Sequence, residues 1–309
     1  MKKRMNNACH IEGLLYQHSL EKKVTGAHSK NPGTEFITGT IEIATDNAIT
    51  NIVPVHFTYV TATTAKGSAN AVFNILANII DGTHHSVMEH GADKATMLRI
   101  STSIGLNEFY SDRKGTLELV SAKRNEGGFI HVVNALDEDE SRRNTFDVDM
   151  IITNVRHVDA DEERQLPEKA IVKGAIFDFK KALLPIELSA VDPRAIDYFE
   201  GLDASPREPV FTRLKGNQIS ETIVRVIEEE SAFGTPSIRE VKSTKKDFVI
   251  TWAQANPYDW DDEETILASE LKEAMSAREI YLATIKKRQD EYLASKEKPA
   301  IAASSDFNF

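Results

Sequence analysis

The chain has 309 residues, 41% of them hydrophobic, and a formal net charge of −11. This length predicts two domains, and the hydrophobic content is enough for packed cores, which excludes a disordered chain. No apolar run approaches the roughly 20 residues of a membrane-spanning helix, and no apolar signal core follows the basic start, so we expect neither a membrane span nor a secretory signal.

Strand patterns dominate the beginning of the chain. A strand is expected over residues 10–20, followed by a polar loop over 21–33. Alternating apolar residues over 35–45 and 49–60 predict a β-hairpin. Pro54 cannot donate a backbone hydrogen bond, so the second of these strands should lie at an edge or a bulge. On that strand Phe57 shares a face with other apolar residues, which favours core packing for its ring.

A helix and further strands should complete this first module. Apolar residues at helical spacing predict a helix over 67–81, with Gly82 ending it. Strands are then expected over 95–106, 116–124 and 129–133, with Gly127 and Gly128 forming a turn. The run of charged residues over 137–145 follows and is the best candidate for a linker.

The same order of elements returns after this linker. Strand patterns are expected over 146–158, 170–179 and 182–191. Asp192 followed by Pro193 predicts the start of a short helix, because Asp caps well and Pro suits the first helical position. The remaining strand patterns cover 211–214, 222–227, 237–242 and 248–252.

The fold class follows from the order of elements, which is the same in both modules: three strands, a helix and two more strands. The chain should be mainly β with some α, built of two tandem OB-like Greek-key barrels followed by a C-terminal helix and a flexible tail. Gly39 and Gly174 occupy matching positions, where a closed barrel needs a small residue as its second strand coils around the corner. A generic β-sandwich is the alternative. The expected segments are module 1 over 1–136, linker 137–145, module 2 over 146–255, helix 256–298 and tail 299–309.

The C-terminal segment changes character. An acidic stretch over 259–264 is favourable at the positive end of a helix dipole, and a long helix should follow it. Its apolar stripe is narrow and is interrupted by Arg278. This pattern favours a helix docked on a domain over a long coiled coil.

Motifs for catalysis are missing from the sequence. It has no phosphate-binding loop and no dinucleotide fingerprint, and the single cysteine, Cys9, excludes a cysteine zinc site and any intramolecular disulfide. The lone cysteine also fits a reducing cytoplasm. His84, His85 and His90 are read as part of a polar loop and not as a metal site. We therefore expect a non-enzymatic protein without a cofactor.

Basic and aromatic residues in the first module predict where a ligand binds. OB barrels bind ligands across strands two and three, between the 1–2 and 4–5 loops. The 4–5 loop could be residues 107–115 or the turn at 123–128. Lysine and arginine neutralise phosphates, and aromatic faces stack on bases without reading them. The candidate nucleic-acid-binding residues are Lys22, Lys23, Lys30, Phe109, Tyr110, Arg113, Lys114, Lys123, Arg124, Phe129 and His131.

Charge separates the two modules. Residues 1–135 sum to +1, residues 136–255 to −7 and residues 256–309 to −5. The second module places acids over 159–163, where its counterpart has lysines, although its last hairpin over 242–247 is basic. We therefore expect one nucleic-acid module and one that supports, dimerises or extends it. Charge reversal at Lys22 and Lys23 should weaken binding more than reversal at Lys245 and Lys246.

With these features the chain resembles the divergent single-stranded DNA-binding proteins encoded by tailed bacteriophages. The local likeness is strongest over 37–59 and 120–131, and the acidic C-terminal region ends in aromatic residues, as theirs does. The resemblance implies that this tail recruits replication or recombination proteins and competes with DNA for the basic groove. It also implies that Asp306, Phe307 and Phe309 contact the partner.

The sequence thus predicts single-stranded DNA binding and protection in phage replication or recombination, in the host cytoplasm. The partners would be single-stranded DNA, proteins recruited by the tail and, in an oligomer, further copies of the chain, with no membrane partner. The alternative is a non-enzymatic virion structural or assembly protein built of two β modules, which the negative net charge also suits.

Overall fold

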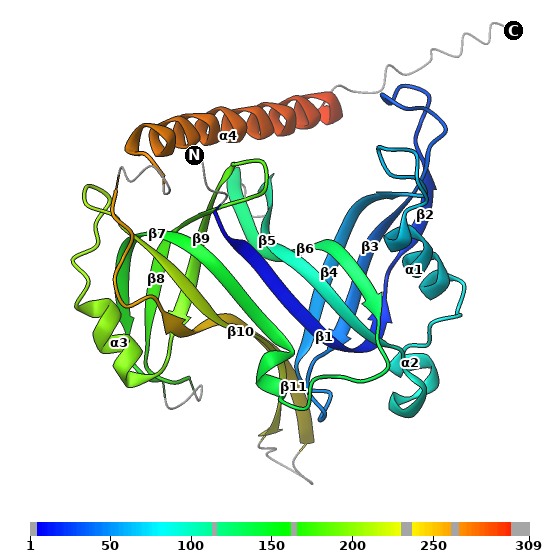
Figure 1. Cartoon of the computed structure of the whole chain (residues 1–309), viewed down its shortest axis with the longest axis horizontal. Coiled ribbons are helices and arrows are strands. Elements are labelled where there is room, and N and C mark those ends of the chain that lie inside the picture. The colour runs from blue at the N-terminus through cyan, green and yellow to red at the C-terminus, as the bar shows by residue number, and fades with distance from the viewer. Residues whose placement is uncertain (1–4, 113–115, 162–165, 230–236, 261–265, 298–309) are drawn as a thin grey trace, which may run out of the picture.

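The computed structural model describes residues 5–112, 116–161, 166–229, 237–260 and 266–297, without the side chains of 221–245 and 296–297. Eleven strands form one continuous sheet that closes on itself twice (Figure 1). The chain is mainly β, with a few short helices and one long C-terminal helix. Within the described residues, no helix is long and apolar enough to cross a membrane.

The first barrel closes in the order of an OB fold. Its first, second and third strands pair antiparallel, its third and fifth pair parallel, and its fourth pairs antiparallel with the first and the fifth. Each strand therefore pairs with two others of the same barrel, which closes the sheet. In chain order these strands are β1 (Asn7–His18), β3 (Glu35–Ala44), β4 (Ile52–Thr61), β5 (Met97–Ser111) and β6 (Glu118–Val132).

The second barrel repeats this pairing strand for strand. Its third and fifth strands again meet in parallel, at Ser189 and Val249. The remaining neighbours are antiparallel. The strands are β7 (Asn144–Val158), β8 (Lys169–Phe177), β9 (Leu183–Ala190), β10 (Val210–Glu229) and β11 (Ser237–Ala253). The prediction of two tandem OB-like barrels is thereby confirmed.

The first strands of the two barrels join them. β1 pairs antiparallel with β7, so the sheet runs from one barrel into the other. The Asn7 side chain strengthens this junction. Its Nδ2 donates to the carbonyl oxygens of Ile104 in the first barrel (2.9 Å) and Phe177 in the second (3.1 Å), and its Oδ1 accepts from Ile104 N (2.9 Å). The two barrels therefore share backbone and side-chain hydrogen bonds.

Two matching glycines allow the second strands to coil. At Gly39, where φ is 131°, an added Cβ would lie 2.2 Å from Ser19 O. At Gly174 it would lie 2.0 Å from Ile151 O. The strand pairing shifts register beside both positions. These contacts exclude any side chain, which confirms the small-residue requirement expected at both positions.

The first short helix begins at residue 71 and not at 67 as predicted, whereas the second begins at the predicted Asp192–Pro193 pair. α1 (Ala71–Ile80) is capped by Asn70, whose side chain accepts from Val72 N, and its buried residues close one end of the first barrel. α3 (Pro193–Glu200) is capped by Asp192, which accepts from Arg194 N, with Pro193 in the first turn. Like α1 in the first barrel, α3 closes one end of the second barrel with its buried residues. α2 (Val87–His90) and two 3-10 turns, Ala92–Lys94 and Glu140–Arg142, lie in connections.

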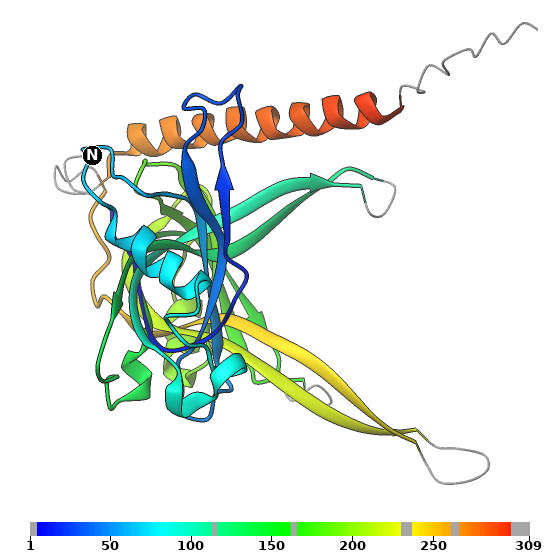
Figure 2. The same cartoon turned by 90° about the vertical axis from the view of Figure 1, so that its right-hand side faces the viewer.

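Two expected turns lie inside strands instead. Gly127 and Gly128 belong to β6, and they are glycines because the Phe57 ring and Ser101 O leave no room for a Cβ. The basic stretch 242–247 belongs to β11, where it pairs along β10. Strands expected as separate pieces therefore merge into two long ribbons, β5–β6 and β10–β11, that project from the body (Figure 2). A short strand, β2 (Glu21–Val24), likewise begins the segment predicted as a polar loop.

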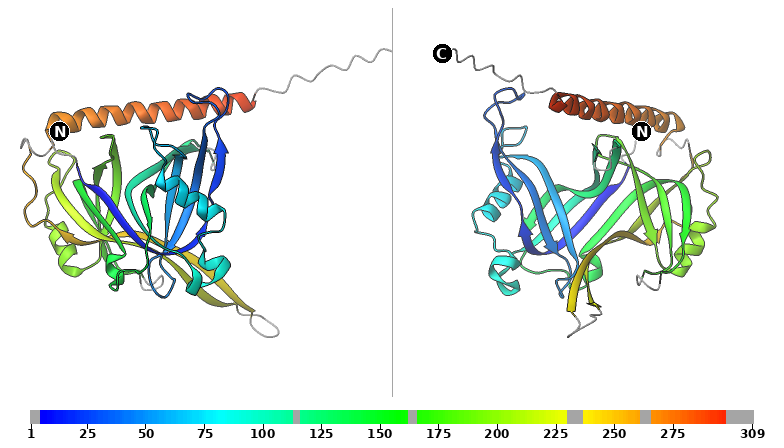
Figure 3. Two further views of the ribbon diagram at one scale, coloured as in Figure 1. Left: turned by 45° about the vertical axis from the view of Figure 1, so that its right-hand side comes forward. Right: turned by 180° about the vertical axis from the view of Figure 1, so that it is seen from behind.

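The C-terminal helix α4 (Ala268–Glu297) lies across the top of both barrels (Figures 1 and 3). Its start is anchored in an apolar cluster that contains buried Ile266, Phe177 and Phe211, with Leu271 and Ala274 packed against it. This cluster is separate from the two barrel interiors. The prediction that this helix docks on a domain is confirmed.

Candidate nucleic-acid interface

A groove of about 950 Å³ lies between the barrels at the side where α4 crosses. Residues of β4, β5 and β6 form its floor. The turn between β8 and β9, together with α4, forms its opposite wall. The third strand of an OB barrel contributes to the usual ligand face, so this groove includes part of the face at which a ligand was expected.

Two exposed aromatic rings lie on the floor. Strand alternation on β6 buries Ile130 and leaves the Phe129 ring 71% exposed, opposite the small Ser101 of β5. On β4, Phe57 is buried, as predicted, whereas Tyr59 is 47% exposed. Both rings line the same groove. They offer flat apolar surfaces of the kind on which nucleic-acid bases stack.

The polar groups of the floor are mostly paired. Arg124 Nε lies 2.6 Å from Glu126 Oε1, which offsets its charge. His56 Nδ1 lies 3.2 Å from Thr40 Oγ1. Burial, with a further contribution from Arg124, lowers the pKa of His56, so the imidazole is neutral near pH 7. The floor therefore carries little net charge.

The opposite wall comes from the second barrel and α4. Phe179, in the β8–β9 turn, is 64% exposed, and Lys180 Nζ lies 5.3 Å from the centre of its ring. Tyr281 of α4 is 45% exposed. Across the whole groove, positive and negative lining residues are equal in number. The cations are Arg124, Lys180 and Arg278, and the acids are Glu108, Glu126 and Asp178.

The three lysines predicted near the N-terminus lie elsewhere. Lys22 forms an ion pair with Asp81 (3.0 Å) at the end of α1, and Lys23 forms one with Glu21 (2.7 Å). Lys30 is exposed in the loop that follows β2. These residues lie on an exposed edge of the first barrel, where acids offset the charges of Lys22 and Lys23, and none of the three lines the groove.

The residues predicted in the 4–5 loop are dispersed along β5 and β6. The connection between these strands is at 112–117, so the reading of 123–128 as that loop is wrong. Phe109 and Tyr110 lie on the projecting part of β5, outside the groove lining. Arg113 and Lys114 lie outside the described residues. His131 is exposed on β6, opposite Arg99.

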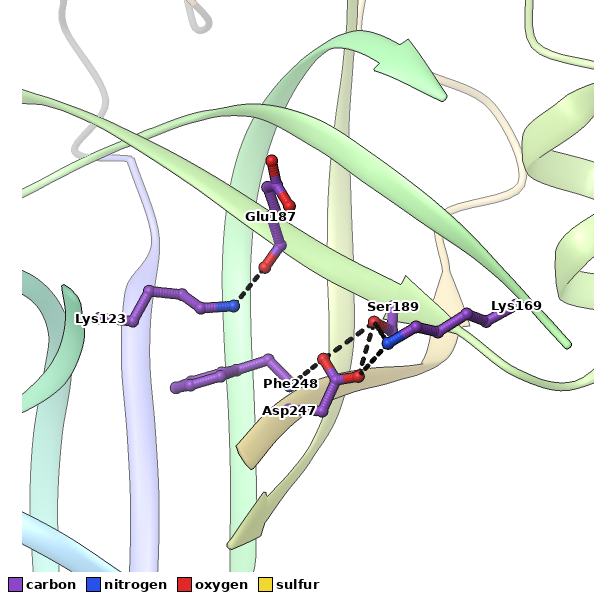
Figure 4. Close-up of polar contacts among 6 residues, drawn as sticks. All are labelled: Lys123, Lys169, Glu187, Ser189, Asp247 and Phe248. Carbon is purple, nitrogen blue, oxygen red and sulfur yellow. Dashed lines mark hydrogen bonds and ion pairs between the residues drawn. The ribbon is translucent and has the colours of Figure 1, made fainter. Parts of the chain in front are cut away.

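Lys123 makes an intramolecular contact with the second barrel. Its Nζ donates to Glu187 O of the second barrel (2.5 Å) and lies 4.9 Å from the centre of the Phe248 ring (Figure 4). Burial lowers its pKa, and the carboxylates of Asp247 and Glu187 partly oppose that shift. This placement sets Lys123 apart from Arg124 and Phe129, which the structure brings together in the groove.

The equivalent face of the second barrel lies beneath the β5–β6 ribbon. The hollow between them is smaller, about 560 Å³. Lys173 and Glu187 form an ion pair on its floor (2.7 Å), and Leu119 and Ser121 of β6 line the other side. Its lining, taken over the part of the chain that the structure describes, contains no aromatic residue. This face of the second barrel therefore lacks the exposed rings that line the groove beside the first barrel.

Sequence reasoning missed four residues of this groove. Tyr59 lies two residues after Phe57 in the same alternating pattern, but the register shift between β3 and β4 exposes its ring. An aromatic residue next to two lysines in a short turn was a usable signal for Phe179 and Lys180. Tyr281 carried no such signal, because its position follows from how α4 docks. The tail residues Asp306, Phe307 and Phe309 lie outside the described residues.

Comparison with solved structures gives distant likenesses. A deletion mutant of the single-stranded DNA-binding protein from Thermus aquaticus has 10% identity and a TM-score of 0.46, over 84% of this chain and 99% of that chain. The wild-type protein has 9% identity and a TM-score of 0.44, over 81% and 93%. A replication protein A heterotrimer bound to single-stranded DNA has 10% identity and a TM-score of 0.19, over 91% and 70%.

Among curated proteins, no sequence matches this chain. A family model, however, matches nearly its full length, from residue 6 to residue 288. That range contains both barrels and most of α4. The family is described as YorF, and the chain belongs to it.

Proposed function

We propose that this protein binds single-stranded DNA in the groove and does so without catalysis. The observation that carries the proposal is the pair of exposed rings, Tyr59 and Phe129, on the floor of an open groove at the ligand face of an OB-like barrel. An exposed aromatic ring stacks on any base, and each stack contributes about 1–3 kcal/mol. Binding of this kind does not depend on the nucleotide sequence of the DNA.

Polar groups of the floor complete the proposed binding site. Arg124 can contact a phosphate at the cost of its bond to Glu126, and the hydroxyls of Ser101 and Ser103 line the same surface. Because cations and acids balance in the groove, stacking would supply more of the affinity than charge. About two phosphate contacts would give a slope near −1.4 for log K against log salt, since each contributes roughly −0.7 for a single strand.

The test is a fluorescence anisotropy titration with labelled oligo-dT at about 50 mM salt, repeated up to about 300 mM. Phe129→Ala and Tyr59→Ala should each weaken binding by about 5- to 150-fold, which corresponds to one lost stack. Trp252→Ala is the matched control, because this tryptophan is 46% exposed on the second barrel and lies outside the groove. Undetectable binding of the wild-type chain, or equal losses in all three variants, would refute the proposal.

The proposal also covers the biological context of DNA binding and the role of the C-terminal tail. The protein would be phage-encoded, act in DNA replication or recombination in the host cytoplasm and recruit partner proteins through Asp306, Phe307 and Phe309. These parts rest on the sequence resemblance. Removal of residues 300–309 should raise the affinity for oligo-dT if the tail competes for the groove, and unchanged affinity would exclude that competition.

A role in virion structure or assembly is the second candidate, and the projecting ribbons favour it. Phe109 is 42% and Leu119 38% exposed on the β5–β6 ribbon, where apolar side chains could contact another copy. Sedimentation of the purified chain and analysis of purified particles separate the two functions. A large assembly that is present in particles and fails to bind oligo-dT would support the structural role.

A further inference from the structure

The wall opposite the floor carries the same kind of side chain as the floor. Phe179 and Tyr281 expose large parts of their rings, and both line the groove that contains Tyr59 and Phe129. The two wall residues come from the second barrel and from α4, more than 100 positions apart in the sequence. Stacking groups therefore lie on both sides of one space.

Arg278 fixes this wall in place. Its Nη2 lies 2.5 Å from Glu108 Oε1 of β5, and its Nη1 donates to Leu183 O of β9 (3.1 Å). The Glu108 side chain is 2% exposed and that of Arg278 is 13% exposed. A buried guanidinium that contacts both barrels holds α4 at one defined position. Tyr281 follows three residues later and therefore projects from the same side of the helix.

The wall leaves space for a ligand. The residues of α4 that line the groove before Arg278 are Ala274 and Ala277, whose side chains are the smallest that a helix carries without loss of propensity. The volume of about 950 Å³ is present with α4 docked. The helix is therefore a side of the groove and does not fill it.

We propose that Phe179, Lys180 and Tyr281 form a second nucleic-acid-binding surface, so that a single strand lies between the first barrel and α4. Phe179 and Tyr281 stack on bases from the side opposite Phe129, and Lys180 contacts a phosphate. This inference rests on the proposed function. It assigns binding residues to the second barrel, where the sequence predicted support, dimerisation or extension, and to α4, where it predicted only a helix docked on a domain.

Two-sided contact has a kinetic consequence. A strand held between two walls must break contacts with both before it leaves, so loss of either wall should act mainly on the dissociation rate. Arg278 is a positioning residue in this arrangement. Arg278→Ala should also raise the dissociation rate, while Arg278→Lys should restore part of the effect because a cation again faces Glu108.

The experiment measures oligo-dT equilibrium binding and stopped-flow dissociation for Tyr281→Ala, Phe179→Ala and Tyr292→Ala. Tyr292 is the matched control. It lies on the same helix, is 51% exposed and is outside the groove. The first two variants should dissociate about 5- to 150-fold faster, with association nearly unchanged, and Tyr292→Ala should stay within about twofold of wild type.

A second experiment separates failure of this inference from failure of the proposed function. An oligonucleotide that contains 5-iododeoxyuridine is photocrosslinked to the wild-type chain, and the crosslinked residues are identified. Crosslinks at Phe129 or Tyr59 together with crosslinks at Phe179 or Tyr281 support both surfaces. Crosslinks confined to the floor, with wild-type kinetics in Tyr281→Ala and Phe179→Ala, overturn the second surface and leave the first standing. Absence of oligo-dT binding by the wild-type chain overturns both.

Discussion

Lys123 illustrates how a residue that suits DNA contact is used for internal stability. Its ammonium group donates to Glu187 O and lies over the Phe248 ring, which ties the β5–β6 ribbon to the second barrel. Beside it, Lys169 Nζ, Ser189 Oγ and the Asp247 carboxylate form a hydrogen-bonded group within β8, β9 and β11 (Figure 4). The ribbon is therefore attached to the second barrel beside this hydrogen-bonded group.

We predict that Lys123→Ala lowers the free energy of unfolding by about 1–3 kcal/mol, because it removes a hydrogen bond from a charged donor. Its affinity for oligo-dT should stay within about twofold of wild type. Urea denaturation followed by circular dichroism measures the first quantity and anisotropy the second. Lys66→Ala, at an exposed lysine before α1, serves as the control. A large loss of affinity for oligo-dT with unchanged stability would show instead that Lys123 contacts DNA.

His157 gives the fold a pH-dependent element. The hydrogen bond from its ring to Glu200 raises its pKa, and the charges of Glu168 and Asp159 act in the same direction. A raised pKa means that the folded state binds the proton more tightly than the unfolded state. The resulting stabilisation is fully present below the ordinary histidine pKa of about 6.5 and is lost as pH rises through the raised value.

His157→Gln should accordingly melt at a lower temperature than wild type at pH 5.5, and the difference should shrink by pH 8.5. Thermal unfolding by differential scanning fluorimetry, at intervals of half a pH unit, measures this. His131→Gln controls for a general effect of replacing an exposed histidine. A difference in melting temperature that does not vary with pH would show that His157 acts by packing alone.

At the scale of elements, local patterns predicted most of the fold. The first two hairpins and both capped helices follow from alternation, glycine placement and the Asp192–Pro193 pair. The ribbons were missed because Gly127 and Gly128 read as a turn. These glycines are required by tertiary contacts instead, since Phe57 and Ser101 approach from other strands. Contacts of this kind with strands distant in the sequence cannot be predicted from a local sequence pattern.

Gly174 allows a direct test of the corner in the second barrel. We predict that Gly174→Ala destabilises the chain by about 1–3 kcal/mol or more, because the new Cβ would meet Ile151 O at 2.0 Å, a contact that only a backbone shift can relieve. Gly26→Ala is the control, since no atom lies within 4 Å of the Cβ it would add. Equal urea midpoints for the two variants would show that β8 does not need glycine at this corner.

At the scale of the whole molecule, the candidate groove depends on the packing of distant segments. Its lining comes from Asn7 and from residues within the segments 56–60, 101–108, 124–129, 178–184 and 274–281. Arg124 and Phe129 could be predicted because they lie in the first module, which is nearly neutral overall and has basic flanking loops. Phe179 and Tyr281 could not, because their contribution depends on the β1–β7 junction and on the docking of α4.

The duplicated barrels predict unequal binding, which stoichiometry can measure. The face of the second barrel lies under the β5–β6 ribbon, and the lining of its smaller hollow, as far as the chain is described, offers no aromatic ring for stacking. A short oligo-dT should therefore saturate at one molecule per chain in a titration at protein concentrations well above Kd. Lys173→Glu combined with Glu187→Lys, which reverses the ion pair on that covered face, should leave both the ratio and the affinity unchanged. A ratio of two would mean that the ribbon moves aside and that both barrels bind.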